Sequence, residues 1–201
     1  MAINLQKGHK ISLKKENGTS LNSFCVGANW GAIDSRGLFG GKKKVAVDLD
    51  LSVGLFDNNN ILLDTIYFGN LSTQGVRHSG DDLTGDIDGD DGLDNEVMSI
   101  NLPQLDSRVE QLVFILNSYK GQDFATIPFA SIRLYEGTST RIESIFAKYN
   151  IASDKQFSGY VSMILGKLYK HNGEWKFSAI GEATKDRRLK ETLKSVQTAC
   201  L

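Results

Sequence analysis

The sequence has few of the residues that mark several common protein classes. Its 201 residues include only two prolines and two cysteines, and its net charge at pH 7 is −1. The two cysteines are far apart in the chain, so they do not form a disulfide framework, and a reducing cytoplasm is the expected compartment. The longest apolar run, residues 112–116, is too short to cross a bilayer. The first residues also lack the apolar segment of a secretory signal.

The near-neutral net charge conceals one strongly acidic segment. Residues 81–96 contain eight carboxylates and no lysine or arginine, whereas the rest of the chain has 16 acids and 23 bases. The basic residues form no concentrated stripe, so we expect no nucleic-acid partner. The acidic segment is therefore the feature most informative about function.

The hydrophobic pattern predicts a mainly β protein. Apolar residues alternate with polar residues in several short segments that are separated by turn residues, as is typical of an antiparallel β-sandwich. An opening hairpin is expected around Lys7–Gly8, and the Asn172–Gly173 dipeptide is a strong hairpin signal. Loops are expected at residues 34–44 and 69–95. The expected strands lie at residues 21–30, 45–51, 61–68, 96–102, 112–116, 127–135, 141–149, 160–169 and 174–180.

The end of the chain, residues 181–201, is predicted to form a helix, because residues 182–198 contain no turn residues. Leu189, Leu193 and Val196 have helical spacing and would pack on the sandwich. No linker-like segment and no internal repeat interrupts the sequence. We therefore expect a single domain covering residues 1–201.

The acidic segment has the composition of a metal-binding loop. Two unit charges about 5 Å apart repel by roughly 3 kcal/mol at an effective dielectric constant near 20. Because the segment contains no base, it must stay extended in water, meet bases from elsewhere, or bind cations. Gly85, Gly89 and Gly92 permit sharp turns that would bring carboxylates together. Many hard oxygen ligands favour Ca²⁺ over Mg²⁺, and the scarcity of His and Cys disfavours zinc.

The acidic loop is not an EF-hand, and a second pair of acids extends the candidate site. If Asp86 is the first position of an EF-hand loop, Asp91 occupies the position that requires Gly, and Val97 the position that requires Glu. Asp48 and Asp50 lie on one face of a predicted strand, where they require either a cation or a base such as residues 42–44. Ten carboxylates exceed the needs of one Ca²⁺, so we expect two ions. A simple solvated acidic loop is the alternative.

Four stretches of the sequence together resemble one protein family. They are the acidic stretch 78–91 followed by Glu96, the opening residues 5–8 with 12–13, the strand 47–52, and the closing residues 166–169, 172–177 and 179–181. These stretches resemble the TerD family of tellurium-resistance and stress proteins. The resemblance spans nearly the whole chain, but Asn29-Trp30-Gly31 stands where many members have Gly-Trp-Asp. Four additional residues, 92–95, precede Glu96, which makes Asp94 an alternative to Glu96 as a ligand.

The resemblance implies a β-sandwich that binds Ca²⁺ through acidic loops in a bacterial cytoplasmic protein. It implies a non-enzymatic role in stress response and tellurite resistance, in complexes with other stress-resistance proteins and at the inner surface of the cytoplasmic membrane. Carried over to this sequence, the metal ligands are carboxylates together with the backbone carbonyls of three residues. The full candidate set is Asp48, Asp50, Gly80, Asp81, Asp82, Leu83, Gly85, Asp86, Asp88, Asp90, Asp91, Asp94 and Glu96.

Three other functions remain open from the residues alone. A metal-dependent hydrolase could use an ion in the acidic loop, with His78 and Ser79 as the tempting catalytic pair, although adjacent residues of an extended chain point to opposite faces. A module that binds a small ligand or nucleotide could use the same loop, although no phosphate-binding GxxxxGK[ST] motif is present. Thiol chemistry on tellurite is disfavoured because Cys25 lies in a predicted core strand.

Overall fold

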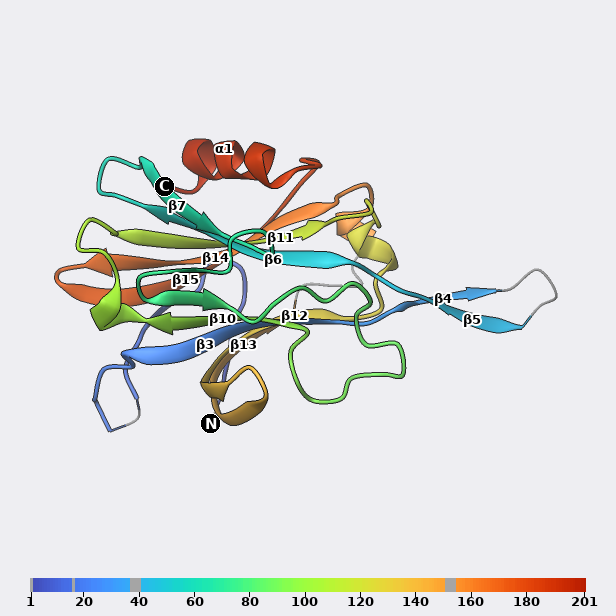
Figure 1. Cartoon of the computed structure of the whole chain (residues 1–201), viewed down its shortest axis with the longest axis horizontal. Helices are drawn as coiled ribbons and strands as arrows, with labels where there is room; N and C mark the ends of the chain where they lie inside the picture. The colour runs from blue at the N-terminus through green and yellow to red at the C-terminus, as the bar shows by residue number, and fades with distance from the viewer. Residues whose placement is uncertain (1, 16, 37–40, 151–154) are drawn as a thin grey trace.

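Two β-sheets pack face to face in the computed structural model, which describes residues 2–15, 17–36, 41–150 and 155–201 (Figure 1). We call the seven-stranded sheet the first sheet and the six-stranded sheet the second sheet. The first sheet has the order β1 (Ile3–Asn4), β13 (Arg141–Asn150), β12 (Ala130–Thr138), β3 (Ser23–Trp30), β10 (Glu96–Asn101), β9 (Val76–His78) and β8 (Ser72–Thr73). The second sheet has the order β2 (Lys10–Ser12), β15 (Glu174–Thr184), β14 (Ser162–His171), β11 (Gln111–Ser118), β6 (Leu49–Phe56) and β7 (Leu62–Ile66).

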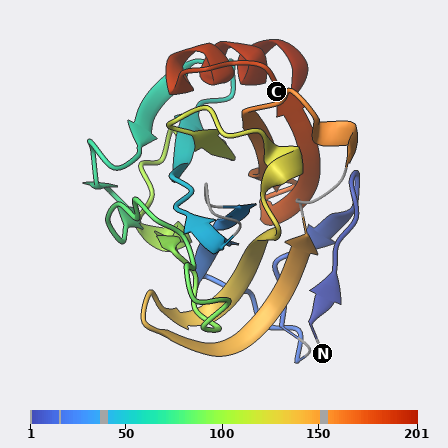
Figure 2. The ribbon, with the colours of Figure 1, turned by 90° about the vertical axis from the view of Figure 1, so that its right-hand side faces the viewer.

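The remaining elements cover or extend the sandwich. The helix α1 (Leu189–Ala199) lies over the outer face of the second sheet, and the hairpin of β4 (Ile33–Arg36) and β5 (Lys42–Val45) projects from one end (Figures 1 and 2). Three short 3₁₀ turns are η1 (Leu102–Gln104), η2 (Phe124–Thr126) and η3 (Lys155–Phe157). Within the described residues, no helix has the length and apolar character needed to span a membrane. The fold class is confirmed: the protein is a mainly antiparallel β-sandwich with the α-helix α1 near the end of the chain.

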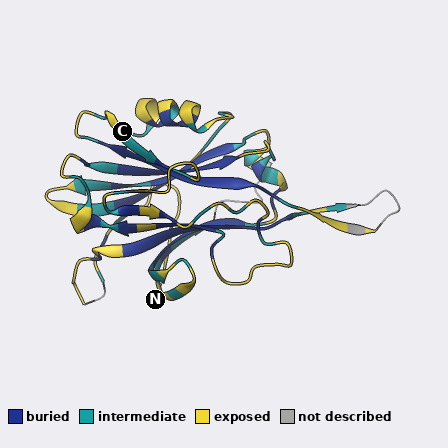
Figure 3. Cartoon of the chain, in the orientation of Figure 1, coloured by how far each residue is buried: buried dark blue, intermediate teal, exposed yellow. Residues whose placement is uncertain are grey.

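The hydrophobic core lies between the two sheets because alternate residues of each strand point inward. Leu51 and Val53 of β6 and Phe114 of β11 are fully buried in this core. A second, smaller cluster on the outer face of the second sheet joins Phe56, Val113, Ile115 and Ile164 to Leu193 and Val196 of α1. Figure 3 shows the result, with buried strands and a helix exposed on its outer side. β11 is therefore covered on both faces, as its continuous apolar sequence predicts.

The predicted Asn172–Gly173 hairpin is confirmed, and other local features also follow the sequence. The Asp57–Asn60 segment forms the turn between β6 and β7, and the Asp57 backbone N–H donates to the Ile61 carbonyl over 3.0 Å. Asn172 and Gly173 have φ angles of 52° and 76°, and they connect β14 to β15. Positive φ at both positions is the geometry that an Asn-Gly hairpin turn favours. On β15, Phe177 and Ala179 are both buried, so this face of the strand packs in the core.

Two predicted elements near the start of the chain are wrong. The strands around Lys7–Gly8 do not form a hairpin, because β1 pairs in parallel with β13 and β2 pairs with β15. Leu5 and Leu13 are both buried between the sheets, so this segment crosses from one sheet to the other. The expected loop at residues 34–44 instead contains β4 and β5, which pair from Ile33–Val45 to Arg36–Lys42; residues 37–40 lie outside the described residues.

Three predicted boundaries also differ from the structure. The expected strand at residues 45–51 is divided between the end of β5 and the start of β6, with residues 46–48 between them. The predicted loop at 69–95 contains the short strands β8 and β9, so the acidic loop proper covers residues 79–95. The predicted helix at 181–201 begins only at Leu189, because β15 continues to Thr184, where it pairs with Ser162 of β14.

Candidate metal centre

The acidic loop, residues 79–95, connects the neighbouring antiparallel strands β9 and β10 and is fixed at both ends. The Ser79 backbone N–H donates to the Val97 carbonyl, and the Val97 N–H donates to the Ser79 hydroxyl. In its middle, the Asp86 N–H donates to the Trp30 carbonyl over 3.0 Å. Trp30 is fully buried, and its indole N–H donates to the Val47 carbonyl. The loop is thereby joined to the end of β3 and to the segment that leads into β6.

Glu96 and His78 anchor the loop beneath the site. Glu96 is completely buried, and its two carboxylate oxygens accept the N–H groups of Leu51 (2.7 Å) and Asp82 (3.1 Å). The His78 Nδ1 atom accepts the Gly80 N–H, so Nε2 carries the ring proton and faces the Leu51 carbonyl at 3.0 Å. His78 Nε2 also lies 3.3 Å from Glu96. Burial raises the pKa of Glu96, although the hydrogen bonds that Glu96 accepts from His78 and from the N–H groups of Leu51 and Asp82 lower it.

Asp82 and Asp94 are likewise engaged with partners inside the protein. One carboxylate oxygen of Asp82 accepts the N–H groups of Thr84 and Gly85, and these bonds lower the pKa of Asp82 although its burial acts in the opposite direction. Asp94 is buried against Gly27 and forms a 2.8 Å ion pair with Arg133. Burial raises the pKa of Asp94 to about 6 despite the contact with Arg133. Arg133 meets one carboxylate oxygen of Asp94, whereas the other is buried without a hydrogen-bond partner among the described residues. The ligand role considered for Asp94 from the sequence therefore stays a prediction.

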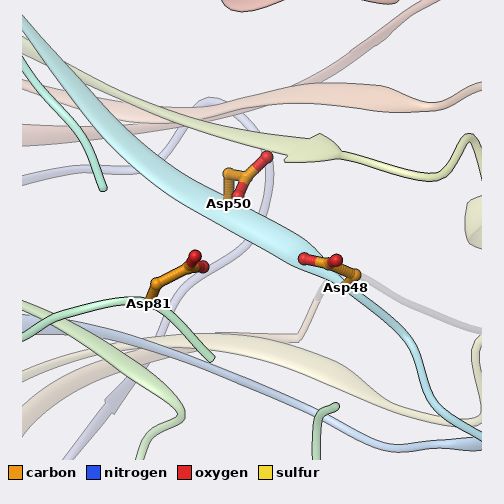
Figure 4. Close-up of side chains that lie close together, drawn as sticks. All are labelled: Asp48, Asp50 and Asp81. Atoms are coloured by element: carbon orange, nitrogen blue, oxygen red, sulfur yellow. The ribbon is translucent and has the colours of Figure 1, made fainter. Parts of the chain in front are cut away.

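The first acidic cluster consists of Asp48, Asp50 and Asp81, whose ligand atoms lie within 4.8 Å of one another. Asp81 extends from the acidic loop toward β6, and the Asp48 carboxylate turns back along the chain toward Asp50 (Figure 4). Asp48 and Asp50 are 2% and 7% exposed. Burial, together with Glu96, Asp48 and Asp81, raises the pKa of Asp50 to about 8. The cluster therefore holds more negative charge than its buried position tolerates without a proton or a cation.

A lysine does reach this cluster, but not one of those suggested by the sequence. Lys120 approaches one oxygen of Asp48 at 3.1 Å, whereas Lys44 pairs with Asp34 at 2.8 Å in the β4–β5 hairpin. The other oxygen of Asp48 is buried and has no hydrogen-bond partner among the described residues. Lys120 therefore compensates only part of the charge of this cluster.

The second acidic cluster consists of Asp86, Asp90 and Asp91, again within 4.8 Å of one another. Two amides support it: Asn29 donates to Asp90 over 3.0 Å and Asn95 donates to Asp86 over 2.9 Å. Burial and the nearby charges of Asp91 and Asp90 raise the pKa of Asp86, although the hydrogen bond from Asn95 lowers it. One buried oxygen of Asp86 has no partner in the described part of the chain. Sequence reasoning missed Asn29, Asn95 and Lys120, because only the folded chain brings them to these acids.

The other predicted ligands lie outside the two clusters. Asp88 is exposed between Asp86 and Asp90, and it is a member of neither group. Gly80, Leu83 and Gly85 remain predictions as carbonyl donors. Gly80 and Gly85 have positive φ angles of 121° and 65°, which a glycine adopts without strain. A side chain at Gly85 would also collide with the Trp30 indole.

The sequence matches the family model of the TerD domain over residues 1–195. The chain belongs to the TerD family. Tellurium resistance protein TerZ of Serratia marcescens is 34% identical, over 99% of each chain. Stress response protein SCP2 of Bacillus subtilis is 36% identical, over 96% of this chain and 98% of the relative.

A solved structure supports the fold assignment. A homologue of telluride resistance protein TerD from Streptomyces coelicolor A3(2) superposes with a TM-score of 0.65 at 12% identity, over 85% of this chain and 95% of that chain. At this identity the likeness establishes the fold alone. The protein is thus a TerD domain of a family whose curated relatives are named for tellurium resistance and stress response.

The two clusters of this TerD domain fit a hard divalent cation. Their ligand atoms are carboxylate oxygens, which Ca²⁺ and Mg²⁺ prefer and zinc does not. Asp48 and Asp86 each keep a buried oxygen without a hydrogen-bond partner among the described residues. Such an oxygen costs about 1–3 kcal/mol when it is left unsatisfied, so a cation at each cluster would remove a real penalty.

Proposed function

We propose that this TerD domain is a Ca²⁺-binding stress-response module that holds two ions. The observation that carries the proposal is the pairing of two separate carboxylate clusters with a buried, unpartnered oxygen in each, at Asp48 and Asp86. Ca²⁺ is favoured over Mg²⁺ because it accepts six to eight oxygens in flexible geometry, whereas Mg²⁺ requires a nearly ideal octahedron. The glycine-rich acidic loop provides such flexible geometry.

We further propose that the module acts through protein complexes, in the cytoplasm or at the inner membrane surface, and does not catalyse a reaction. A hydrolase would need a base and a nucleophile beside the ion. His78 is buried with both ring nitrogens in contact with protein groups, and the Ser79 hydroxyl accepts the Val97 N–H. Both residues therefore act in holding the loop, which supports a binding role over a hydrolytic one.

Calorimetric titration of the purified protein with Ca²⁺ and Mg²⁺ tests the cation site. Asp81→Asn removes a ligand of the first cluster, and Asp91→Asn removes one of the second. Both residues are exposed, so these changes leave the fold intact. Asp88→Asn is the matched control, because it removes the same charge from the same loop outside both clusters. We expect each cluster variant to lose one binding event and the control to retain both.

Thermal unfolding gives an independent measure of cation binding. A ligand at 100 times its Kd stabilises a folded protein by roughly 2.7 kcal/mol. For a chain of this size, that gain raises Tm by about 5–10 °C. An absence of both heat and Tm change with Ca²⁺ would refute the proposal, and so would a loss of binding in Asp88→Asn equal to that in Asp81→Asn. Hydrolysis of a phosphodiester substrate only in the presence of Ca²⁺ would favour the enzymatic alternative.

A further inference from the structure

A cleft of about 320 Å³ opens on the outer face of the second sheet, beside the start of α1. We call it the α1 cleft. Residues Phe56, Val113 and Ile115 of this face are covered by the helix. Near the start of α1 at Leu189, the outward-facing Ser52 of β6 and Asn117 of β11 line the cleft.

The floor of the α1 cleft has unsatisfied polar atoms. The Ser52 side chain is 1% exposed and that of Asn117 is 5% exposed. The Asn117 amide donates to Thr192 over 3.0 Å, but its oxygen has no hydrogen-bond partner in the described residues, and neither does the Ser52 hydroxyl. Buried polar groups in native proteins are rarely left without a partner. These two groups, which line one cleft, point to a ligand with hydrogen-bonding atoms.

Aromatic rings form one wall of the α1 cleft. Tyr67, Phe68 and Tyr119 all line it, with ring centroids 5.3 Å apart for Tyr67–Phe68 and 6.0 Å for Phe68–Tyr119. Tyr119 is 65% exposed and Phe68 is 38% exposed. Exposed aromatic faces beside unsatisfied polar atoms suit a planar ring, which gains from stacking and edge-to-face contacts.

Two arginines also line the α1 cleft. They are Arg187 and Arg188, and no ion pair involves either guanidinium among the described residues. Arg188 is the N-cap of α1, and Glu191 in the first turn accepts the Arg187 backbone N–H over 2.9 Å. The two guanidinium groups favour an anion, above all a phosphate, which accepts several hydrogen bonds at once.

We propose that the α1 cleft binds a small molecule that carries a phosphate monoester and a planar heteroaromatic ring, the chemistry of a nucleoside monophosphate. The phosphate lies toward Arg187 and Arg188, and the ring lies against Tyr119. Asp50 of the first acidic cluster also lines the cleft. A cation in that cluster would cancel the repulsion between Asp50 and the phosphate, so binding should be tighter in Ca²⁺; this last point alone rests on the proposed function.

Titration of the full chain with AMP, GMP, CMP and UMP, in saturating Ca²⁺ and separately in EGTA, tests the proposal. We expect at least one of them to bind. The double variant R187A/R188A should weaken that binding about tenfold or more, as the loss of charge-assisted hydrogen bonds requires. The matched control K190A/K194A removes two exposed charges from α1 itself without touching the cleft, and it should bind like the wild type. Tyr119→Ala should weaken binding about fivefold or more through loss of stacking.

Three results would overturn this assignment. The first is that none of the four nucleotides binds. The second is that R187A/R188A and K190A/K194A bind the nucleotide with equal affinity. The third is that the protein binds no nucleotide but sediments with phosphatidylglycerol vesicles in a way that depends on the two arginines, which would identify a lipid surface as the ligand. A Ca²⁺ titration of R187A/R188A separates the two proposals. Nucleotide binding in EGTA by a protein that takes up no Ca²⁺ would sustain the cleft and refute the cation module. Ca²⁺ uptake without nucleotide binding would do the reverse.

Discussion

The buried ion pair between Asp94 and Arg133 offers a direct test of which acids in the loop are structural. We predict that Arg133→Met destabilises the protein strongly at pH 8. Arg133 and Asp94 are 7% and 8% exposed, so the substitution leaves a buried carboxylate without its cationic partner. Breaking such a pair typically costs about 3–5 kcal/mol. For a chain of this length, that loss lowers Tm by about 6–20 °C.

The destabilisation caused by Arg133→Met should depend on pH in a defined direction. Burial raises the pKa of Asp94 to about 6, from 3.8, while Arg133 and Lys148 lower it and Asp90 raises it. Because the folded protein then binds more protons than the unfolded chain, stability falls as pH rises through the window between these values. Removal of Arg133 raises this pKa further and extends the fall to higher pH. Arg133→Met should therefore be milder at pH 5, where Asp94 is protonated.

Circular dichroism melting in EGTA at pH 5 and pH 8 measures these effects. The double variant D94N/R133M should recover much of the stability that Arg133→Met loses, since it removes both charges of the buried pair. In Ca²⁺ titrations, the double variant should retain both binding events. Equal costs of Arg133→Met at the two pH values would contradict the electrostatic argument, and loss of a Ca²⁺ site in D94N/R133M would show that Asp94 is a ligand after all.

Two further predictions address the first acidic cluster and the helix. The raised pKa of Asp50, about 8, means that the cation-free protein is mostly protonated there at pH 7, so Ca²⁺ binding should release about one proton. Titrations in buffers with different ionisation enthalpies measure this number, and a value near zero would contradict it. Leu193→Ala should lower the free energy of unfolding by about 2–4 kcal/mol, because Leu193 packs on the outer cluster of the second sheet. Urea unfolding tests this cost, with the exposed Lys194→Ala as control, and equal midpoints for the two variants would contradict it.

Much of the sandwich was predictable because its signals are local. Alternating polarity located most strands, and Asn172–Gly173 identified its hairpin from two residues. The opening segment was mispredicted because its strands pair with β13 and β15, and no local pattern reveals such distant partners. The start of α1 was placed too early for a similar reason, since Glu182 and Thr184 continue a strand only because β14 lies beside them.

The acidic site was predictable in composition but not in the role of each acid. The sequence shows many carboxylates near several glycines, and the structure gathers six of them into two clusters. Glu96 and Asp94 have the same charge as the cluster members, yet each is held by partners far away in the chain. Glu96 meets Leu51, and Asp94 meets Arg133. Sequence spacing contains no information on such contacts, so the ligand role of these two acids stays a prediction.

The contact of Glu96 and His78 with Leu51 affects the tendency of the protein to self-associate. At Leu51, the edge of β6 is closed by two side chains, not by a neighbouring strand, since β7 pairs only from Val53 onward. Displacement of these side chains would uncover an open strand edge, a template for pairing with another molecule. Loosening of the acidic loop would therefore favour self-association through this part of β6.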